Sequence, residues 1–195
     1  MGLFSNAKQQ TQQDPISIYS AKYTSARGSL LWISVFTFLN IIFSVIDGSR
    51  FLFSAIIPSV LLEYTRFICG MFPAEQYQEY ENPQFADKSL FWIAVAVSVL
   101  VSLFFLLCYF FSKKKVGCLI AALVVFALDT VFMFLFLTTG IYLVTEIIFH
   151  AWAIISLAMG IYAHNKLQAL KAAEHFATFT ESDPSQAYQD MDSLQ

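Results

Sequence analysis

Residues 90–137 read LFWIAVAVSVLVSLFFLLCYFFSKKKVGCLIAALVVFALDTVFMFLFL, two long apolar runs separated by a lysine triplet. The runs, 90–112 and 116–137, each have the length of about 17–25 residues that a helix needs to cross a hydrocarbon core roughly 30 Å thick. Two further runs of this kind occupy residues 29–46 and 141–163. The sequence therefore predicts an all-α membrane protein whose residues 29–163 form a four-transmembrane-helix bundle.

The composition points to the same class of protein. Of 195 residues, 57% are hydrophobic and only 13% are charged, whereas soluble domains usually carry about 25% charged residues. The 14 acidic residues outnumber the 11 lysines and arginines, which argues against a nucleic-acid partner. We expect the lipid bilayer as one partner, together with a second copy of the chain or another membrane protein.

An outer segment, residues 47–89, connects the first two predicted spans. Within it, residues 51–72 are largely apolar, but the unbroken apolar run covers only 51–62, which is short for a span, contains Pro58, and is followed by Glu63 and Arg66. Burying an acid and a base in lipid is costly, which argues against a fifth span. We expect a re-entrant or interfacial helix on the outer side, kinked at Pro58, in which Glu63 and Arg66 form an ion pair three residues apart.

The distribution of basic residues also favours four spans over five. Four spans place eight lysines and arginines on one side and three on the other, and the positive-inside rule makes the richer side cytoplasmic. The eight are Lys8, Lys22, Arg27, Lys113, Lys114, Lys115, Lys166 and Lys171, against Arg50, Arg66 and Lys88. Five spans would divide them about four against six. We predict a multi-pass protein of the cell membrane with a cytoplasmic N-terminus and a cytoplasmic C-terminus.

Both ends of the chain are more polar than the spans. Residues 1–28 are predicted as a cytoplasmic arm, disordered in its glutamine-rich first part, and residues 164–195 as a cytoplasmic tail with a disordered end. Apolar residues recur at helical spacing over 16–27, which predicts either a short helix on the membrane surface or an extended linker. The beginning of the tail also has helical spacing.

Ionisable side chains inside predicted spans are expensive, so they are the main site candidates. Asp129 lies in the third span, while Glu146 and His150 lie four residues apart on one face of the fourth. A connection of only three residues makes these spans antiparallel neighbours, which brings Asp129 level with His150. Asn40 and Ser98 lie at a similar depth, roughly 9–12 Å from the outer ends of their spans.

This polar layer has three interpretations. It is structural if its members hydrogen-bond between helices to fix the packing. It is a proton or cation site if the two acids and the imidazole offset one another's desolvation. It is a metal site if Asp129, Glu146 and His150 act as ligands, a weak candidate because the H-E-x-x-H spacing is missing. Neither a cofactor-binding motif nor paired cysteines in CxxC spacing occur in the sequence.

Small residues predict close contacts between helices. Ala94, Ser98 and Ser102 form a four-residue ladder in the second span, and Ser156 and Gly160 form another in the fourth. These ladders, together with the missing catalytic motif, favour a protein that acts by helix–helix or partner interactions and is not an enzyme. A small proton- or cation-coupled transporter or channel subunit is the alternative, and an intramembrane metal-dependent enzyme is the second alternative.

Three short stretches resemble those of a group of small multi-span bacterial membrane proteins. They are ARGSLL at 26–31, FLFSAIIP at 51–58 and FHAW at 149–152. The resemblance covers approximately residues 20–165 and excludes both ends of the chain. It implies kinship with these proteins and no particular activity.

Overall fold

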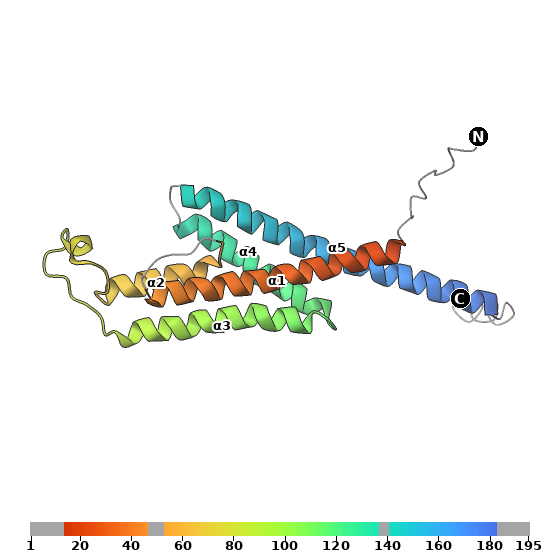
Figure 1. Ribbon diagram of the computed structural model, residues 1–195, viewed down its shortest axis with the longest axis horizontal. Helices are drawn as coiled ribbons and strands as arrows, with labels where there is room; N and C mark the ends of the chain where they lie inside the picture. Colours follow the sequence, from red (N-terminus) through yellow and green to blue (C-terminus); the bar gives the residue numbers. More distant parts are fainter. Residues whose placement is uncertain (1–13, 47–52, 137–140, 183–195) are drawn as a thin grey trace, which may run out of the picture.

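The structure is a computed structural model that describes residues 14–46, 53–136 and 141–182. These residues form five α-helices and one short 3-10 helix (Figure 1). The elements are α1 (Pro15–Ile46), α2 (Ile56–Ile68), η1 (Ala74–Tyr77), α3 (Ser89–Phe111), α4 (Val116–Phe136) and α5 (Ile141–Ser182). The helices α1, α3, α4 and α5 are long and apolar enough to cross a membrane, which confirms the four predicted spans at the level of length and composition.

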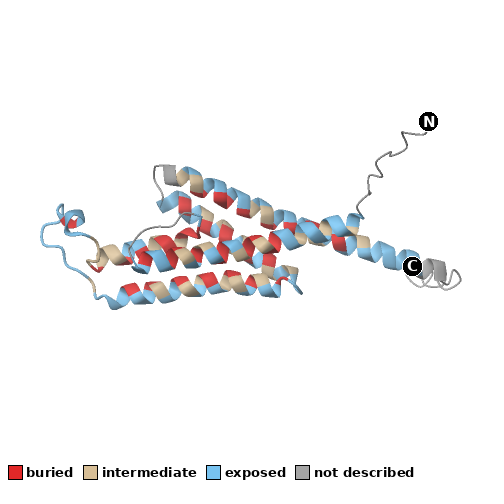
Figure 2. Cartoon of the chain, in the orientation of Figure 1, coloured by how far each residue is buried: buried red, intermediate tan, exposed pale blue. Residues whose placement is uncertain are grey.

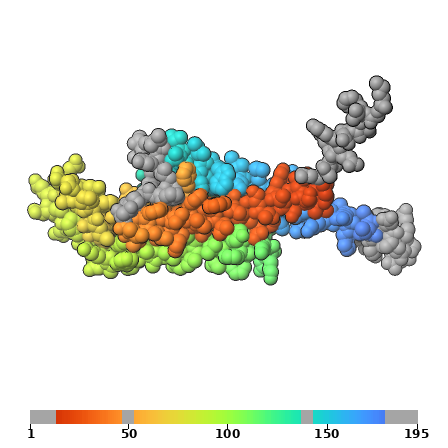
Figure 3. Space-filling model, viewed as in Figure 1, coloured from red at the N-terminus to blue at the C-terminus, as the bar shows by residue number. Residues whose placement is uncertain are grey.

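The four long helices lie alongside one another, with α1 packed against both α5 and α3. The short helix α2 packs against α3, α1 and α4 near the end where the η1 loop projects. The beginning of α1 and the second half of α5 extend from the opposite end of the bundle (Figure 3). Buried residues face the interior between the helices, while the outer faces carry exposed apolar side chains (Figure 2). Outward-facing apolar side chains suit a lipid environment.

Two clusters of buried side chains hold the helices together. One joins the four long helices through residues such as Leu30, Phe105, Phe126 and Leu157. The other attaches α2 to α1 and α3 and consists of Ile41, Leu62, Cys69, Phe91 and Ala94. The packing of α2 therefore belongs to the core of the bundle.

The helices at both ends of the chain are longer than the predicted spans. Because α1 begins at Pro15 and continues through Gly28, the predicted surface helix or linker at 16–27 is a continuous part of the first long helix. Contacts with α5 support this extension, including an edge-on ring contact of Tyr19 with Tyr162. The helix α5 runs to Ser182, in agreement with the helical spacing at the start of the tail. The predicted disorder in 1–13 and 183–195 lies outside the described residues.

The outer segment contains a shorter helix than the one predicted over 51–72, since α2 covers only Ile56–Ile68. Pro58 lies in the first turn of α2, where its missing N–H removes no helical hydrogen bond, so the predicted kink is wrong. Beyond α2, Gly70 adopts a φ of +67°, and a Cβ there would lie 2.7 Å from the ring of Phe85. Only glycine fits both that backbone conformation and that approach, so the segment turns sharply after α2.

Candidate functional site

The centre of the candidate site is the beginning of α2, which is held by a side chain of α4. Asp129 accepts the backbone N–H of Ile56 at Oδ2 and that of Ile57 at Oδ1, both at 2.8 Å. Its side chain is only 2% exposed. The first amides of a helix lack partners within the helix and carry partial positive charge, which favours an anionic acceptor. Asp129, which lies on α4, therefore caps a different helix, α2.

His150 of α5 connects this cap to a third helix. Its Nε2 lies 3.1 Å from Asp129 Oδ2, and its Nδ1 lies 2.9 Å from the backbone oxygen of Glu146. The imidazole therefore lies between the carboxyl group of Asp129 on α4 and the backbone of its own helix.

The imidazole of His150 is buried between aromatic rings and two carboxyl groups. The ring of Phe126 stacks on the imidazole with centroids 4.7 Å apart, and Phe149 meets it edge-on. His150 is 1% exposed, and Glu146 is fully buried with its Oε2 3.9 Å from His150 Nδ1. The structure thus brings together Asp129, Glu146 and His150, as the sequence predicts for neighbouring antiparallel helices.

The helix α1 holds the same end of α2 through polar side chains. Asn40 Nδ2 donates to Ser59 Oγ at 2.5 Å, and Thr37 Oγ1 accepts the backbone N–H of Ala55 at 3.1 Å. The sequence did not single out Ser59 or Thr37 as site residues, because hydroxyl groups are common in apolar helices. Ser98 is buried on α3, but its Oγ makes no hydrogen bond to any described residue. The network therefore includes Asn40 and excludes Ser98.

The remaining predicted site residues, Glu63 and Arg66, lie toward the other end of α2. Arg66 donates from Nη1 to the backbone oxygen of Ser44 at 3.0 Å, and its guanidinium lies over the ring of Phe72. Glu63 is exposed. The ion pair between Glu63 and Arg66 stays a prediction, while Arg66 has the additional role of binding a carbonyl group in the last turn of α1.

A second arginine, Arg27, binds a helix end in the same manner. Its Nε donates to Ser112 Oγ at 2.9 Å, and its Nη2 donates to the backbone oxygen of Tyr109 at 3.3 Å. A cation at a helix C-terminus is favourable because the last carbonyl groups carry partial negative charge. From the sequence, Arg27 is only one basic residue of the N-terminal arm, since no neighbouring residue relates it to the end of α3.

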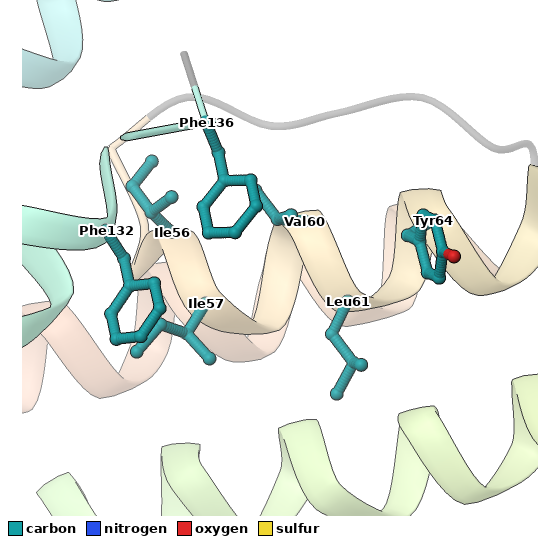
Figure 4. Close-up of a pocket in the computed structure, with 7 residues that line it drawn as sticks. All are labelled: Ile56, Ile57, Val60, Leu61, Tyr64, Phe132 and Phe136. Carbon is teal, nitrogen blue, oxygen red and sulfur yellow. The ribbon is translucent and has the colours of Figure 1, made fainter. Parts of the chain in front are cut away.

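An apolar groove of about 380 Å³ lies beside the capped end of α2 (Figure 4). Its lining residues are Ile56, Ile57, Val60, Leu61, Tyr64, Phe132 and Phe136. The side chains of Ile56 and Ile57 face the groove, whereas their amides are bound to Asp129. The Tyr64 hydroxyl is the one polar side-chain group in this lining, so the groove offers no set of groups for chemistry.

The described residues also contain no group of three or more His, Cys, Asp or Glu arranged to hold a metal ion. No protein family, curated protein or solved structure matches this chain. The geometry itself must therefore indicate the function. Its chief property is that Asp129, His150 and Asn40 position the first turn of α2 inside the bundle.

Proposed function

We propose that this chain is a small multi-pass protein of the cell membrane that acts through interactions with other membrane proteins or with a second copy of itself. The observation that carries the proposal is the bonding of Asp129. Its carboxyl group binds two backbone amides and contacts His150, so this buried acidic side chain joins three helices of the bundle. The outer faces of the long helices are apolar and remain available for lipid or for other helices.

The proposal includes a topology with both termini in the cytoplasm and α2 as a re-entrant helix. The free ends of α1 and α5 extend from the same end of the bundle, which also carries the lysine turn at 113–115 (Figure 1). The beginning of α2 lies beside Asp129, within α4, and its other end lies toward the η1 loop. Within lipid, backbone amides need partners from protein, and Asp129 and Thr37 supply them here.

Cysteine labelling tests the topology. Glu79→Cys in the outer loop and Lys114→Cys in the lysine turn are introduced separately, after Cys69, Cys108 and Cys118 have been changed to alanine. We expect a membrane-impermeant maleimide to label Glu79→Cys in intact cells and Lys114→Cys only after lysis. The opposite pattern would overturn the orientation.

Photo-crosslinking tests the interaction itself. A photoreactive amino acid replaces one exposed apolar residue on each of three helices, Leu100 on α3, Val124 on α4 and Ile148 on α5. In native membranes we expect a discrete protein adduct from at least one position, with buried Leu157 as the control that gives none. Adducts with lipid alone at all three positions would contradict an interaction protein.

A second candidate function is proton or cation transport, and the buried contact between Asp129 and His150 favours it. Flux across proteoliposomes containing a pH-sensitive dye separates the two functions. For an interaction protein we expect the wild type to conduct no faster than protein-free liposomes. A wild-type flux that is lost in Asp129→Asn would make transport the better assignment.

A further inference from the structure

A second groove, of about 290 Å³, runs along the junction of α1 and α5 and contains none of the residues that hold α2. Its lining residues are Lys22, Ser25 and Ala26 from α1 and Trp152, Ile155, Ser156 and Met159 from α5. These residues recur at steps of three and four, so each helix contributes a single stripe of its surface. No carboxylate belongs to the described lining, and Lys22 supplies its one charge.

The floor of this groove is fixed by a close contact between the two helices. Ser29 Oγ lies 2.7 Å from Ser156 Oγ, and a Cβ on Gly160 would come within 2.3 Å of the Cβ of Ala26. The small residues predicted as a ladder on the fourth span thus allow α5 to touch α1. Because the backbones meet behind it, the groove is a fixed feature of the junction.

Basic and aromatic side chains gather at one end of the groove. Lys22 Nζ lies 5.7 Å from the ring centroid of Tyr19, and Lys166 Nζ lies 5.8 Å from that of Tyr162. The two tyrosine rings contact each other edge-on with centroids 6.4 Å apart. Two lysines from distant parts of the sequence therefore flank one pair of tyrosines.

The other end of the groove is apolar and open to the surroundings. Trp152, Ile155 and Met159 are 45%, 58% and 51% exposed, so they wall the groove without closing it. From Tyr162 to Trp152 the stripe extends about 15 Å along α5, the reach of a good part of an acyl chain. Positive charge at one end and apolar surface along the rest match an amphipathic anion.

We propose that this groove binds one anionic phospholipid. The phosphate lies between Lys22 and Lys166 at the level of the tyrosines, and one acyl chain follows Met159 and Ile155 to Trp152. Tyrosine favours the membrane interface, and each lysine near an anionic headgroup contributes to binding. The inference rests on the proposed membrane location, but it requires neither a protein partner nor a particular orientation.

Trp152 provides a direct reporter of this lipid. Changing Trp32 and Trp92 to phenylalanine leaves Trp152 as the only tryptophan, because the chain has three. The protein is placed in two kinds of lipid nanodisc. In one, phosphatidylglycerol carries brominated acyl chains and phosphatidylcholine is unlabelled; in the other, phosphatidylcholine carries the bromine and phosphatidylglycerol is unlabelled. We expect brominated phosphatidylglycerol to quench Trp152 at a several-fold lower mole fraction than brominated phosphatidylcholine.

Two matched double variants locate the charge that is responsible. Lys22→Gln with Lys166→Gln should reduce the preference by roughly fivefold for each lysine removed. Lys113→Gln with Lys114→Gln removes the same charge from exposed lysines of the α3–α4 turn and should leave the preference unchanged. Equal quenching by both lipids in the wild type, or an equal loss in both double variants, would overturn the proposal.

Native mass spectrometry keeps the proposal testable if the first double variant fails to fold. Wild type and the turn variant, purified from membranes of mixed phosphatidylglycerol and phosphatidylcholine, should each retain one phosphatidylglycerol per chain. Release of all lipid, or retention of the two lipids in proportion to their abundance, would overturn it. Retained lipid alongside failed protein adducts in the crosslinking experiment would separate this inference from the proposed function.

Discussion

The first amides of α2 and of α3 are each bound by an aspartate, and these two aspartates act in different surroundings. Asp87 lies just before α3 and accepts the N–H of Ser89 at 2.7 Å, at the exposed surface. Asp129 serves the beginning of α2 from a different helix and accepts two amides while almost fully buried. When the exposed acceptor is lost, water can bind the N–H group that it leaves behind. Water cannot easily reach the N–H groups that the buried acceptor leaves behind. The same residue type is therefore a local cap in one region and an anchor between helices in the other.

Removal of Asp129 should have the largest effect on stability. Asp129→Ala leaves two buried amides and His150 without their acceptor, and we expect a loss of about 3–5 kcal/mol in the free energy of unfolding. Asp129→Asn should fall between this variant and wild type because its one oxygen still accepts. Unfolding in detergent measures these values, with Asp87→Ala as the matched control that loses far less. Equal losses at both aspartates would break the comparison.

Removal of His150 should be the next most costly change. His150→Ala loses the hydrogen bond to Asp129 and the ring stacked on Phe126, for which we expect about 2–3 kcal/mol. The two amides of α2 keep their acceptor, so the loss should be smaller than in Asp129→Ala. The same unfolding experiment on His175→Ala, which changes an exposed histidine of α5, should show no loss. If His150→Ala behaved like that control, Asp129 would hold the first turn of α2 without support from His150.

The contact between α1 and α5 sharpens the comparison, because α5 carries His150 to the anchor. Gly160→Ala places a methyl group against Ala26, and we expect overpacking to cost about 1–3 kcal/mol. Gly117→Ala is the matched control, since a Cβ there meets nothing within 4 Å. It should be neutral or stabilising by up to roughly 1 kcal/mol. Thermal melting of both variants decides whether the close contact matters for stability.

The pH dependence of the exposed aspartate should give the smallest effect. Hydrogen bonds from the side chain and backbone N–H of Ser89 lower the pKa of Asp87 from 3.8. A lowered pKa in the folded state stabilises the protein above the unfolded value, and this contribution disappears as the pH falls through the folded value. Melting temperatures of Asp87→Asn should therefore lie slightly below wild type at pH 7, and the difference should shrink as the pH falls below 3.8 toward the lower folded value. A difference that does not shrink below pH 3.8 would point to another cause.

The spans and the meeting of Asp129 with His150 follow from the sequence because they depend on regular periods. Helical spacing places Glu146 and His150 on one face, and a short connection makes their helix antiparallel to that of Asp129. The same regularity places Ser156 and Gly160 on one face of α5, although only the structure shows that α1 packs there. Local order of this kind needs no knowledge of distant residues.

The role of Asp129 as a helix cap was beyond sequence reasoning. Backbone amides occur at every residue, so nothing in the side chains of Ile56 and Ile57 identifies them as its partners. One signal was available, because proline is common in the first turn of a helix and Pro58 therefore could mark the beginning of α2. We interpreted Pro58 as a kink instead. Arg27 at the end of α3 escaped for the same reason as Asp129.

The lengths of α1 and α5 have a mechanical consequence. At 1.5 Å per residue, the 42 residues of α5 extend about 63 Å, roughly twice the thickness of a hydrocarbon core. If α5 crosses the membrane as proposed, about half of the helix, almost 30 Å, extends beyond the hydrocarbon core as a lever arm. A tilt of about 10° at the Gly160 contact would swing its tip by about 5 Å. Small rearrangements inside the bilayer would thus become large displacements at a distance from it.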